Sequence, residues 1–242
     1  MIADVERRYL DKHGFGALSP KAVLFDMDGV LYDSMPNHAI AWQEAMASAG
    51  LTMTAYDAYA TEGQRGPDTI RQMARQQWGH DISEEEGQRL YDEKARRFHA
   101  LPEAPLMPGI MGIMEQIRSQ GWLIGVVTGS GQRPLLERLQ RDFGAFVTPD
   151  HIVTAYDVRR GKPHPDPYLM GLRKVGNLEP WQAVVVENAP LGVRASVAAG
   201  IFTIGVNTGI LTEESLQEEG ADLTFPTMND LNFQWKELWK GQ

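Results

Sequence analysis

The sequence contains no cysteine, which excludes disulfide bonds, thiolate catalysis and zinc sites with sulfur ligands. It also has no apolar run long enough to cross a membrane. Its beginning carries Asp4, Glu6, Arg7 and Arg8, where a secretion signal would have an apolar core. We therefore expect a soluble, cytoplasmic protein that has no membrane partner.

Positive charge is also scarce, with 23 Lys and Arg against 32 Asp and Glu, so the net charge is −9. This balance argues against nonspecific binding of nucleic acid. It also means that an anionic substrate would need a bound metal or local cations to offset repulsion. With 242 residues, of which 43% are hydrophobic, the chain can form one large domain or two small ones.

Residues 21–34, KAVLFDMDGVLYDS, contain a short apolar run that stops abruptly at two acidic residues. The run at 22–25 predicts a strand buried on both faces of a parallel sheet. Asp26 and Asp28 follow it, at the edge where open α/β sheets bind ligands. Two such carboxylates indicate a hard cation such as Mg²⁺, or a division into nucleophile and acid, and these two readings are compatible. The simpler alternative is a solvated turn.

The chain from about residue 37 to residue 101 lacks strand signals. Helices are expected at 37–50, 69–78 and 83–99, the last opening with Ser-Glu-Glu-Glu, a helix-start signature. We interpret this block as an inserted all-helical cap domain at 36–101, within a core domain formed by residues 21–35 and 102–242. Residues 1–20 are an N-terminal extension that could begin a short helix and whose role the sequence does not indicate.

Strands alternate with helices after Pro108-Gly109. Strands are expected at 122–127, 152–154, 183–186, 202–206 and 222–225, with helices at 110–120, 134–143, 167–175 and 191–199. This alternation predicts an α/β fold with a doubly wound parallel sheet.

Polar groups follow the carboxyl ends of the principal strands. Thr128 and Ser130 follow one strand, Glu187 and Asn188 follow another, and Lys162 lies in a loop between two turn residues. Taken singly, these residues fit a strand-to-helix turn, a helix cap and a solvated lysine. Taken together with the acidic pair, they predict one site with metal ligands and hydroxyl donors.

These motifs resemble, in residues and order, those of the haloacid-dehalogenase-like phosphotransferase superfamily. They are DMDGV at 26–30, VVTGS at 126–130, GKPHPD at 161–166 and VVVENAPLG at 184–192. The helical block resembles the caps of the β-phosphoglucomutase and phosphoglycolate phosphatase group. The segments FDMDGVLYDSMPNHAIAW, EGQRG and ENAPLGV resemble more closely the members described as inorganic pyrophosphatases. The resemblance implies a Rossmann-like core, a cap, Mg²⁺ as cofactor and a small phosphorylated substrate.

The resemblance also implies roles for the acidic pair and its neighbours. Asp26 would be the nucleophile that forms an aspartyl-phosphate, and Asp28 would be the general acid and base. Thr128 would hydrogen-bond the transferring phosphoryl group, which Gly129 and Ser130 would help to bind. The Mg²⁺ ligands would be Asp26, the backbone carbonyl of Asp28, Glu187 and Asn188, with the last two completing or orienting the shell. Lys162 would neutralise the charge shared by Asp26 and the phosphoryl group.

Three further positions bear on the substrate. His38 lies where the mutase group has a hinge histidine linked to acid–base control, although it also fits a polar residue on a helix face. Asn188 replaces the last metal carboxylate of many relatives, and Glu62 replaces a cap lysine. We hypothesise that Glu62 reaches the metal when the cap closes and restores the lost charge, the alternative being an exposed glutamate. Arg65 is then a candidate for holding a second phosphate.

The sequence thus favours a Mg²⁺-dependent phosphohydrolase acting on a small phosphate compound, with inorganic pyrophosphate first. The alternative is a hexose-phosphate mutase like β-phosphoglucomutase. A phosphate-binding protein without turnover, built on the same scaffold, is the alternative from a different class. The sequence does not indicate an oligomeric state.

Overall fold

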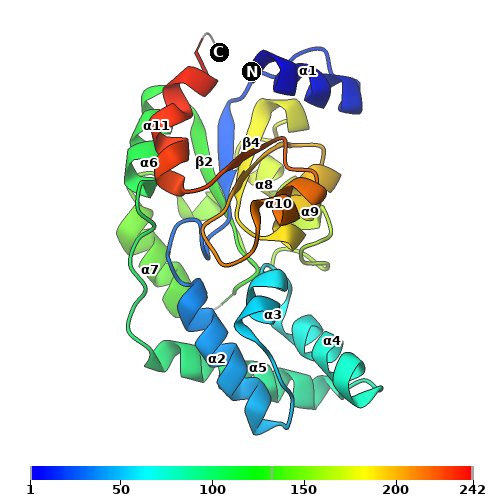
Figure 1. Ribbon diagram of the computed structural model, residues 1–242. Helices are drawn as coiled ribbons and strands as arrows, with labels where there is room; N and C mark the ends of the chain where they lie inside the picture. Colours follow the sequence, from blue (N-terminus) through cyan, green and yellow to red (C-terminus); the bar gives the residue numbers. More distant parts are fainter. Residues whose placement is uncertain (1, 132, 241–242) are drawn as a thin grey trace.

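A computed structural model describes residues 2–131 and 133–240 of the chain (Figure 1). The strands in these residues form one six-stranded parallel sheet in the order β3-β2-β1-β4-β5-β6, which confirms the doubly wound prediction. They are β1 (Ala22–Phe25), β2 (Leu123–Val127), β3 (Ile152–Val153), β4 (Ala183–Glu187), β5 (Phe202–Val206) and β6 (Leu223–Phe225).

The helices surround this sheet and form a second group beyond its edge. They are α1 (Ile2–His13), α2 (Met35–Ser48), α3 (Ala55–Ala60), α4 (Gly66–Trp78), α5 (Glu84–Ala100), α6 (Ile110–Ser119), α7 (Arg133–Phe143), α8 (Asp166–Lys174), α9 (Pro190–Ala198), α10 (Glu213–Glu218) and α11 (Met228–Leu238). Each helix expected from residue 37 to residue 199 is present, with ends shifted by a few residues. Helices α3, α10 and α11 were not predicted from the sequence.

The strand β1 lies in the middle of the sheet and is buried on both faces, as its apolar sequence predicts. Because side chains alternate along a strand, Val23 and Phe25 pack into the core on one face, and Ala22 and Leu24 into the core on the other. Figure 1 shows α6, α7 and α11 covering one face, with α8 and α9 on the other. Because β1 is central and buried on both faces, it holds the backbone of Asp26 in a fixed position.

The N-terminal helix α1 packs against the sheet domain. Tyr9 is fully buried, and its hydroxyl donates a hydrogen bond of 2.9 Å to the carbonyl of Gly200. Val5 and Leu18 belong to the same apolar core as β1. Residues 2–20 are therefore packed onto the sheet domain, at the end that lies far from helices α2 to α5 (Figure 1).

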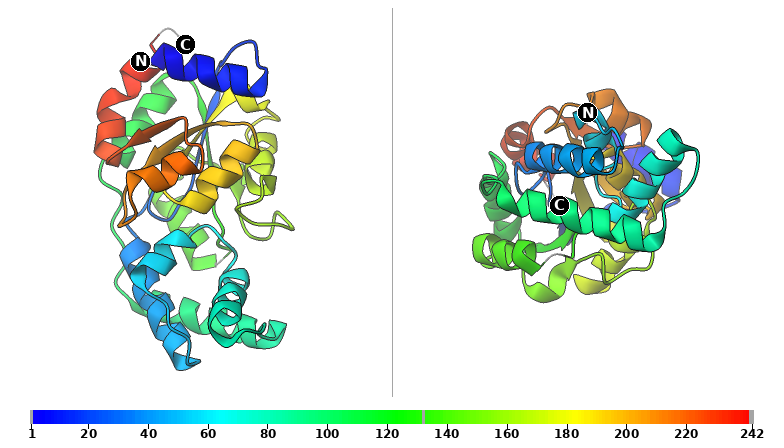
Figure 2. Two further views of the ribbon diagram at one scale, coloured as in Figure 1. Left: turned by 45° about the vertical axis from the view of Figure 1, so that its right-hand side comes forward. Right: turned by 90° about the horizontal axis from the view of Figure 1, so that it is seen from below.

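Helices α2 to α5 enclose an apolar core of their own. Its larger members are Met35, Trp42, Met46, Ile70, Met73 and Leu90. Both figures of the whole chain show this group beyond the carboxyl edge of the sheet (Figure 2). Asn37 Nδ2 donates a hydrogen bond of 2.8 Å to the carbonyl of Pro102. This bond joins the two chain segments that connect the helical group to the sheet domain. The domain limits at residues 36 and 101 stay an interpretation.

The described helices include none with the length and apolarity that a membrane span requires.

Candidate active site

Asp26 and Lys162 form a buried ion pair directly after β1. Lys162 Nζ donates hydrogen bonds to Asp26 Oδ1 at 2.5 Å, to Glu187 Oε1 at 2.7 Å and to the carbonyl of Val127 at 3.1 Å. Burial raises the pKa of Asp26, and the ammonium group of Lys162 opposes that shift. One cation therefore joins the ends of β1, β2 and β4, which gathers the predicted site residues at one edge of the sheet.

Glu187 is fully buried, and both of its carboxylate oxygens already have partners. Oε1 accepts from Lys162 and from the hydroxyl of Tyr168 at 2.7 Å. Oε2 accepts from the backbone N–H groups of Asn188 at 2.9 Å and Ala189 at 3.1 Å. In this arrangement Glu187 holds Lys162, and its predicted role in completing or orienting the metal shell stays a prediction.

Two buried oxygen atoms at the site, Asp26 Oδ2 and Asn188 Oδ1, have no hydrogen-bond partner among the described residues. An unsatisfied buried acceptor costs about 1–3 kcal/mol unless a ligand meets it. Glycine at position 29 lets the Asn188 side chain pack against the loop after β1, since a Cβ on Gly29 would lie 2.0 Å from Asn188 Nδ2. Both oxygens are of the kind that Mg²⁺ prefers, so this donor pair fits the predicted ion.

The described residues contain no group of three or more His, Asp or Glu side chains placed to hold a metal together. This is because Asp28 and Glu187 are turned to other partners, and because one candidate ligand is an asparagine. A complete shell would need backbone oxygens, water or substrate oxygens in addition, as is usual for Mg²⁺.

Asp28 is held by two side chains of the neighbouring α2 segment. Ser34 Oγ donates to Asp28 Oδ1 at 2.6 Å, and His38 Nε2 donates to the same oxygen at 3.1 Å. Burial by itself raises the pKa of Asp28, but the charge and hydrogen bond of His38, together with Ser34, outweigh it and lower the pKa to about 2. Asp28 is therefore a carboxylate, the form of a general base, and must gain a proton before it acts as an acid.

Lys94 of α5 completes this arrangement and was not anticipated from the sequence. Its Nζ lies 2.7 Å from His38 Nδ1, and it is only 4% exposed. Burial lowers its pKa to about 8, while the carboxylates of Glu62 and Asp28 oppose that shift. Because a lysine donates to Nδ1, the proton of a neutral His38 lies on Nε2 and points at Asp28.

A sequence signal for Lys94 existed. Leu90, Lys94 and Phe98 follow one another at intervals of four along α5, so they share a face, and all three are buried. A lysine in the middle of an apolar stripe needs a buried partner, and His38 is that partner.

The cap loop between α3 and α4 rests on the core loops that carry Lys162 and Gly129. A Cβ on Gly63 would lie 2.9 Å from Lys162 Cδ, and one on Gly129 would lie 2.9 Å from the carbonyl oxygen of Gly63. Arg65 Nη1 donates to the carbonyl of Arg159 at 3.2 Å. The cap is thus closed over the strand ends.

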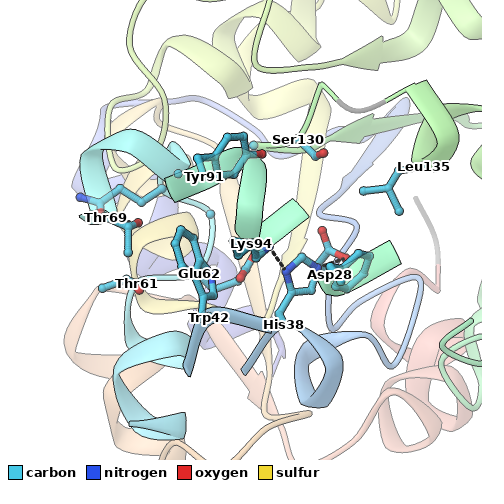
Figure 3. A pocket seen from close by; sticks show the side chains of 15 residues that line it. Asp28, His38, Trp42, Thr61, Glu62, Thr69, Tyr91, Lys94, Ser130 and Leu135 are labelled. Carbon is cyan, nitrogen blue, oxygen red and sulfur yellow. Dashed lines mark hydrogen bonds and ion pairs between the residues drawn. The ribbon is translucent and has the colours of Figure 1, made fainter. Parts of the chain in front are cut away.

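A small cavity of about 40 Å³ lies under this loop (Figure 3). Its described lining consists of Asp28, His38, Trp42, Thr61, Glu62, Gly63, Gln64, Gly66, Thr69, Tyr91, Lys94, Phe98, Gly129, Ser130 and Leu135. Burial raises the pKa of Glu62, with His38 opposing the shift and Asp28 adding to it, so these three groups influence one another across the cavity.

The predicted site residues therefore fall into three sets. Asp28, His38, Glu62, Gly129 and Ser130 line the cavity. Asp26, Thr128, Lys162, Glu187 and Asn188 are buried at the strand ends. Thr128 Oγ1 accepts from the backbone N–H of Ser130 at 3.0 Å, which shapes the turn between the two sets.

Arg65 stands apart, because its exposed guanidinium bonds to the carbonyl of Arg159 and the residue is not among the described lining of the cavity. The position does not favour the predicted grip on a second phosphate in this conformation of the cap.

A central strand that ends in an acidic pair, with a buried lysine and a closed helical cap, defines an enzyme of the phosphoryl-transfer class. The chain belongs to the haloacid dehalogenase-like hydrolase family, whose sequence pattern matches residues 20–200. It is thus an enzyme of the phosphatase and phosphomutase type, as the motifs implied.

Curated relatives agree with this assignment. The chain is 33% identical to validoxylamine A 7'-phosphate phosphatase of Streptomyces hygroscopicus subsp. limoneus, over 78% of this chain and 86% of the relative. It is 34% identical to hexitol phosphatase A of Escherichia coli strain K12, over 77% and 83% of the two chains.

A solved structure from Bacteroides vulgatus, provisionally described as a beta-phosphoglucomutase, superposes with a TM-score of 0.94. It shares 47% sequence identity and covers 98% of this chain and 96% of its own. The likeness thus extends through both the sheet domain and the helices α2 to α5.

Proposed function

We propose that the protein is a Mg²⁺-dependent phosphohydrolase that works through an aspartyl-phosphate at Asp26. The observation that carries this proposal is the state of the Asp26 carboxylate. Its Oδ1 is fixed by Lys162, while its Oδ2 is buried and without a partner among the described residues. A carboxylate held in this way has one oxygen free to attack. Related chains are named as phosphatases, which supports hydrolysis.

In the proposed first step, Asp26 Oδ2 bonds to the phosphorus and the bond to the leaving oxygen breaks. Asp28 enters this step protonated, and the leaving oxygen takes its proton. In the second step Asp28 takes a proton from water, which restores its protonated form, while the water oxygen bonds to phosphorus and the aspartyl-phosphate bond breaks to restore Asp26. Lys162 neutralises charge on Asp26 throughout, and the Thr128 hydroxyl hydrogen-bonds the phosphoryl group.

Phosphatases of this family generally use Mg²⁺. Asn188 Oδ1 and the Asp26 oxygen that does not attack phosphorus would hold the ion, with the backbone carbonyl of Asp28, and Glu187 would act indirectly by orienting Lys162. When bound, Mg²⁺ neutralises the charge of the phosphoryl oxygens and fixes their orientation.

Glu62 is proposed as an additional group that reaches this ion from the cap. Glu62 lines the same cavity as Asp28 of the acidic pair. Glu62→Gln should raise the Mg²⁺ concentration needed for half-maximal turnover of pyrophosphate, while the exposed Glu85→Gln on α5 should not. An unchanged Mg²⁺ requirement and turnover in Glu62→Gln would contradict this role.

Inorganic pyrophosphate is the first candidate for the substrate. A cavity of about 40 Å³ is small beside the roughly 300–1,000 Å³ of pockets that hold drug-sized ligands, which favours a compact leaving group.

A hexose-phosphate mutase remains the second candidate. The contact between His38 and Asp28 favours it, because a mutase must return a proton to the same site in a second transfer. The likeness to the Bacteroides vulgatus structure points the same way. A third candidate, a protein that binds phosphate without turnover, is disfavoured because Asp26, Asp28, Thr128 and Lys162 are all present.

A phosphate-release screen with Mg²⁺ separates these candidates. We expect pyrophosphate to give a higher kcat/KM than hexose phosphates or phosphoglycolate. A coupled assay should run beside it, in which β-glucose 1-phosphate is converted to glucose 6-phosphate. Preferred formation of glucose 6-phosphate would establish the mutase instead. Binding of phosphate or beryllofluoride with no product release from any compound would establish the binding protein.

A further inference from the structure

The Cδ2–Cε2 edge of the Tyr91 ring packs closely against Gly66 at one side of the cavity. A Cβ built on Gly66 would lie 2.1 Å from Tyr91 Cδ2 and 2.2 Å from Cε2, far inside van der Waals contact. Gly66 is buried at the start of α4, and its φ is not in the left-handed region. Its missing side chain is therefore needed for packing, since only glycine leaves room for this ring.

Tyr91 and Trp42 form an aromatic wall at one side of a lining that also contains Phe98 and Leu135. Their ring centroids are 6.4 Å apart, and Trp42 is only 6% exposed. The neighbouring lining residues Thr61, Gln64 and Thr69 are polar. In the view of Figure 3, Tyr91 lies toward Ser130, with Lys94 between it and His38. Because Trp42 is packed into the cap core, the Tyr91 ring has little room to retreat.

We infer that Tyr91 sets the size of the leaving group that this enzyme accepts, and that Gly66 holds its ring in place. The inference rests on the proposed function and sharpens it. The cavity that this wall bounds is only about 40 Å³, so we expect it to accept a compact leaving group such as a phosphate. A hexose ring would require the Tyr91 ring to move, and we expect sugar phosphates to be rejected on size while the acidic pair remains intact.

The test compares kcat/KM for pyrophosphate with kcat/KM for glucose 6-phosphate, with Mg²⁺ present in both assays. In Tyr91→Ala, kcat/KM for glucose 6-phosphate divided by kcat/KM for pyrophosphate should rise by about 10-fold or more, which is the scale of discrimination that pocket size provides. Tyr91→Phe, which keeps the ring and removes the hydroxyl, should leave the ratio within about twofold.

Gly66→Ala supplies a second variant that acts in the opposite direction. Its new methyl group must displace the Tyr91 ring, so we expect turnover of a mid-sized ester such as glycerol phosphate to fall more than turnover of pyrophosphate. The double variant Gly66→Ala/Tyr91→Ala should lose this effect, because the ring that the methyl group displaces is gone.

If the parent enzyme is active and Tyr91→Ala leaves the ratio of the two kcat/KM values unchanged, the inference is wrong and the proposed function still stands. The same conclusion follows if Tyr91→Phe changes the ratio as much as Tyr91→Ala, since the hydroxyl and not the ring would then be responsible. A parent that releases phosphate from no compound would overturn both this inference and the proposed function.

Discussion

Lys94 lies 2.7 Å from the Nδ1 atom of His38, although the two residues are 56 positions apart in the sequence. The contact joins α5 of the cap to α2 at the hinge, and His38 contacts Asp28 from its other ring nitrogen. Because α2 and α5 both belong to the group of cap helices, this contact links Lys94 through His38 to Asp28, the proposed acid and base.

We predict that Lys94→Met lowers kcat by about 10- to 100-fold, because His38 would no longer be held with its proton toward Asp28. KM should change much less, because Lys94 already has His38 as its partner. Arg96→Met removes an equal charge from an exposed site on the same helix and should leave kcat unchanged. Steady-state kinetics of both variants measure the difference, and equal kcat values for them would contradict this role of Lys94.

The next prediction concerns Asn188 and the ion. Mg²⁺ should raise the thermal unfolding temperature of the parent protein, because a ligand that binds only the folded state stabilises it. The Mg²⁺ concentration that gives half of the maximal increase in unfolding temperature should be about 10-fold or more higher in Asn188→Ala than in the parent. In Asn188→Asp this concentration should be lower than in the parent. Thermal titrations without substrate measure this directly. Coincident titration curves for the three proteins would show that Asn188 does not hold the ion.

A third prediction concerns Asp222, which lies far from the site beside α1. Burial raises its pKa to about 6, although the Thr203 N–H bond and the cations of Lys12 and Arg8 oppose the shift. The folded state therefore binds the proton more tightly than the unfolded chain does. The stability that this group contributes is present near pH 4 and is lost as the pH rises through about 6.

Asp222→Asn should remove this loss, because an amide does not ionise. Relative to that of the parent, its free energy of unfolding should increase by about 1–3 kcal/mol as the pH rises from 4 to 7. Urea unfolding at several pH values measures the difference. Asp11→Asn, an exposed change on α1, is the control, and parallel pH profiles for all three proteins would contradict the assignment.

Much of the site followed from local sequence. The run before Asp26 is uniformly apolar, so the buried central strand and its polar end were predictable from four residues. The same holds for β4 and the residues Glu187 and Asn188 that end or follow it. Parallel strands bring their carboxyl ends to one edge, so the meeting of these residues needed no long-range information.

Other features depended on tertiary contacts that no local pattern contains. Whether Glu187 ligates a metal or orients Lys162 depends on Tyr168 and on two backbone N–H groups, all fixed by packing. The side chain of Arg65 was expected at the substrate, but the fold offers it the carbonyl of Arg159.

Among the missed helices, α3 has only six residues, too few for a periodic signal, although Thr54 and Asp57 form a capping box at its start. In α11, by contrast, Met228, Leu231 and Trp235 are spaced as one helix face, and Thr227 caps it, so this helix was readable from the sequence.

The most direct test is to trap the phosphorylated enzyme. The parent protein and Asp26→Asn are mixed with radiolabelled pyrophosphate and Mg²⁺, quenched in acid within milliseconds, digested and analysed by mass spectrometry. We predict phosphate on Asp26 in the parent, none in the variant, and turnover reduced by a factor on the order of 10⁴ or more in the variant. Phosphate on another residue, or undiminished turnover by a folded Asp26→Asn protein, would contradict the proposed mechanism.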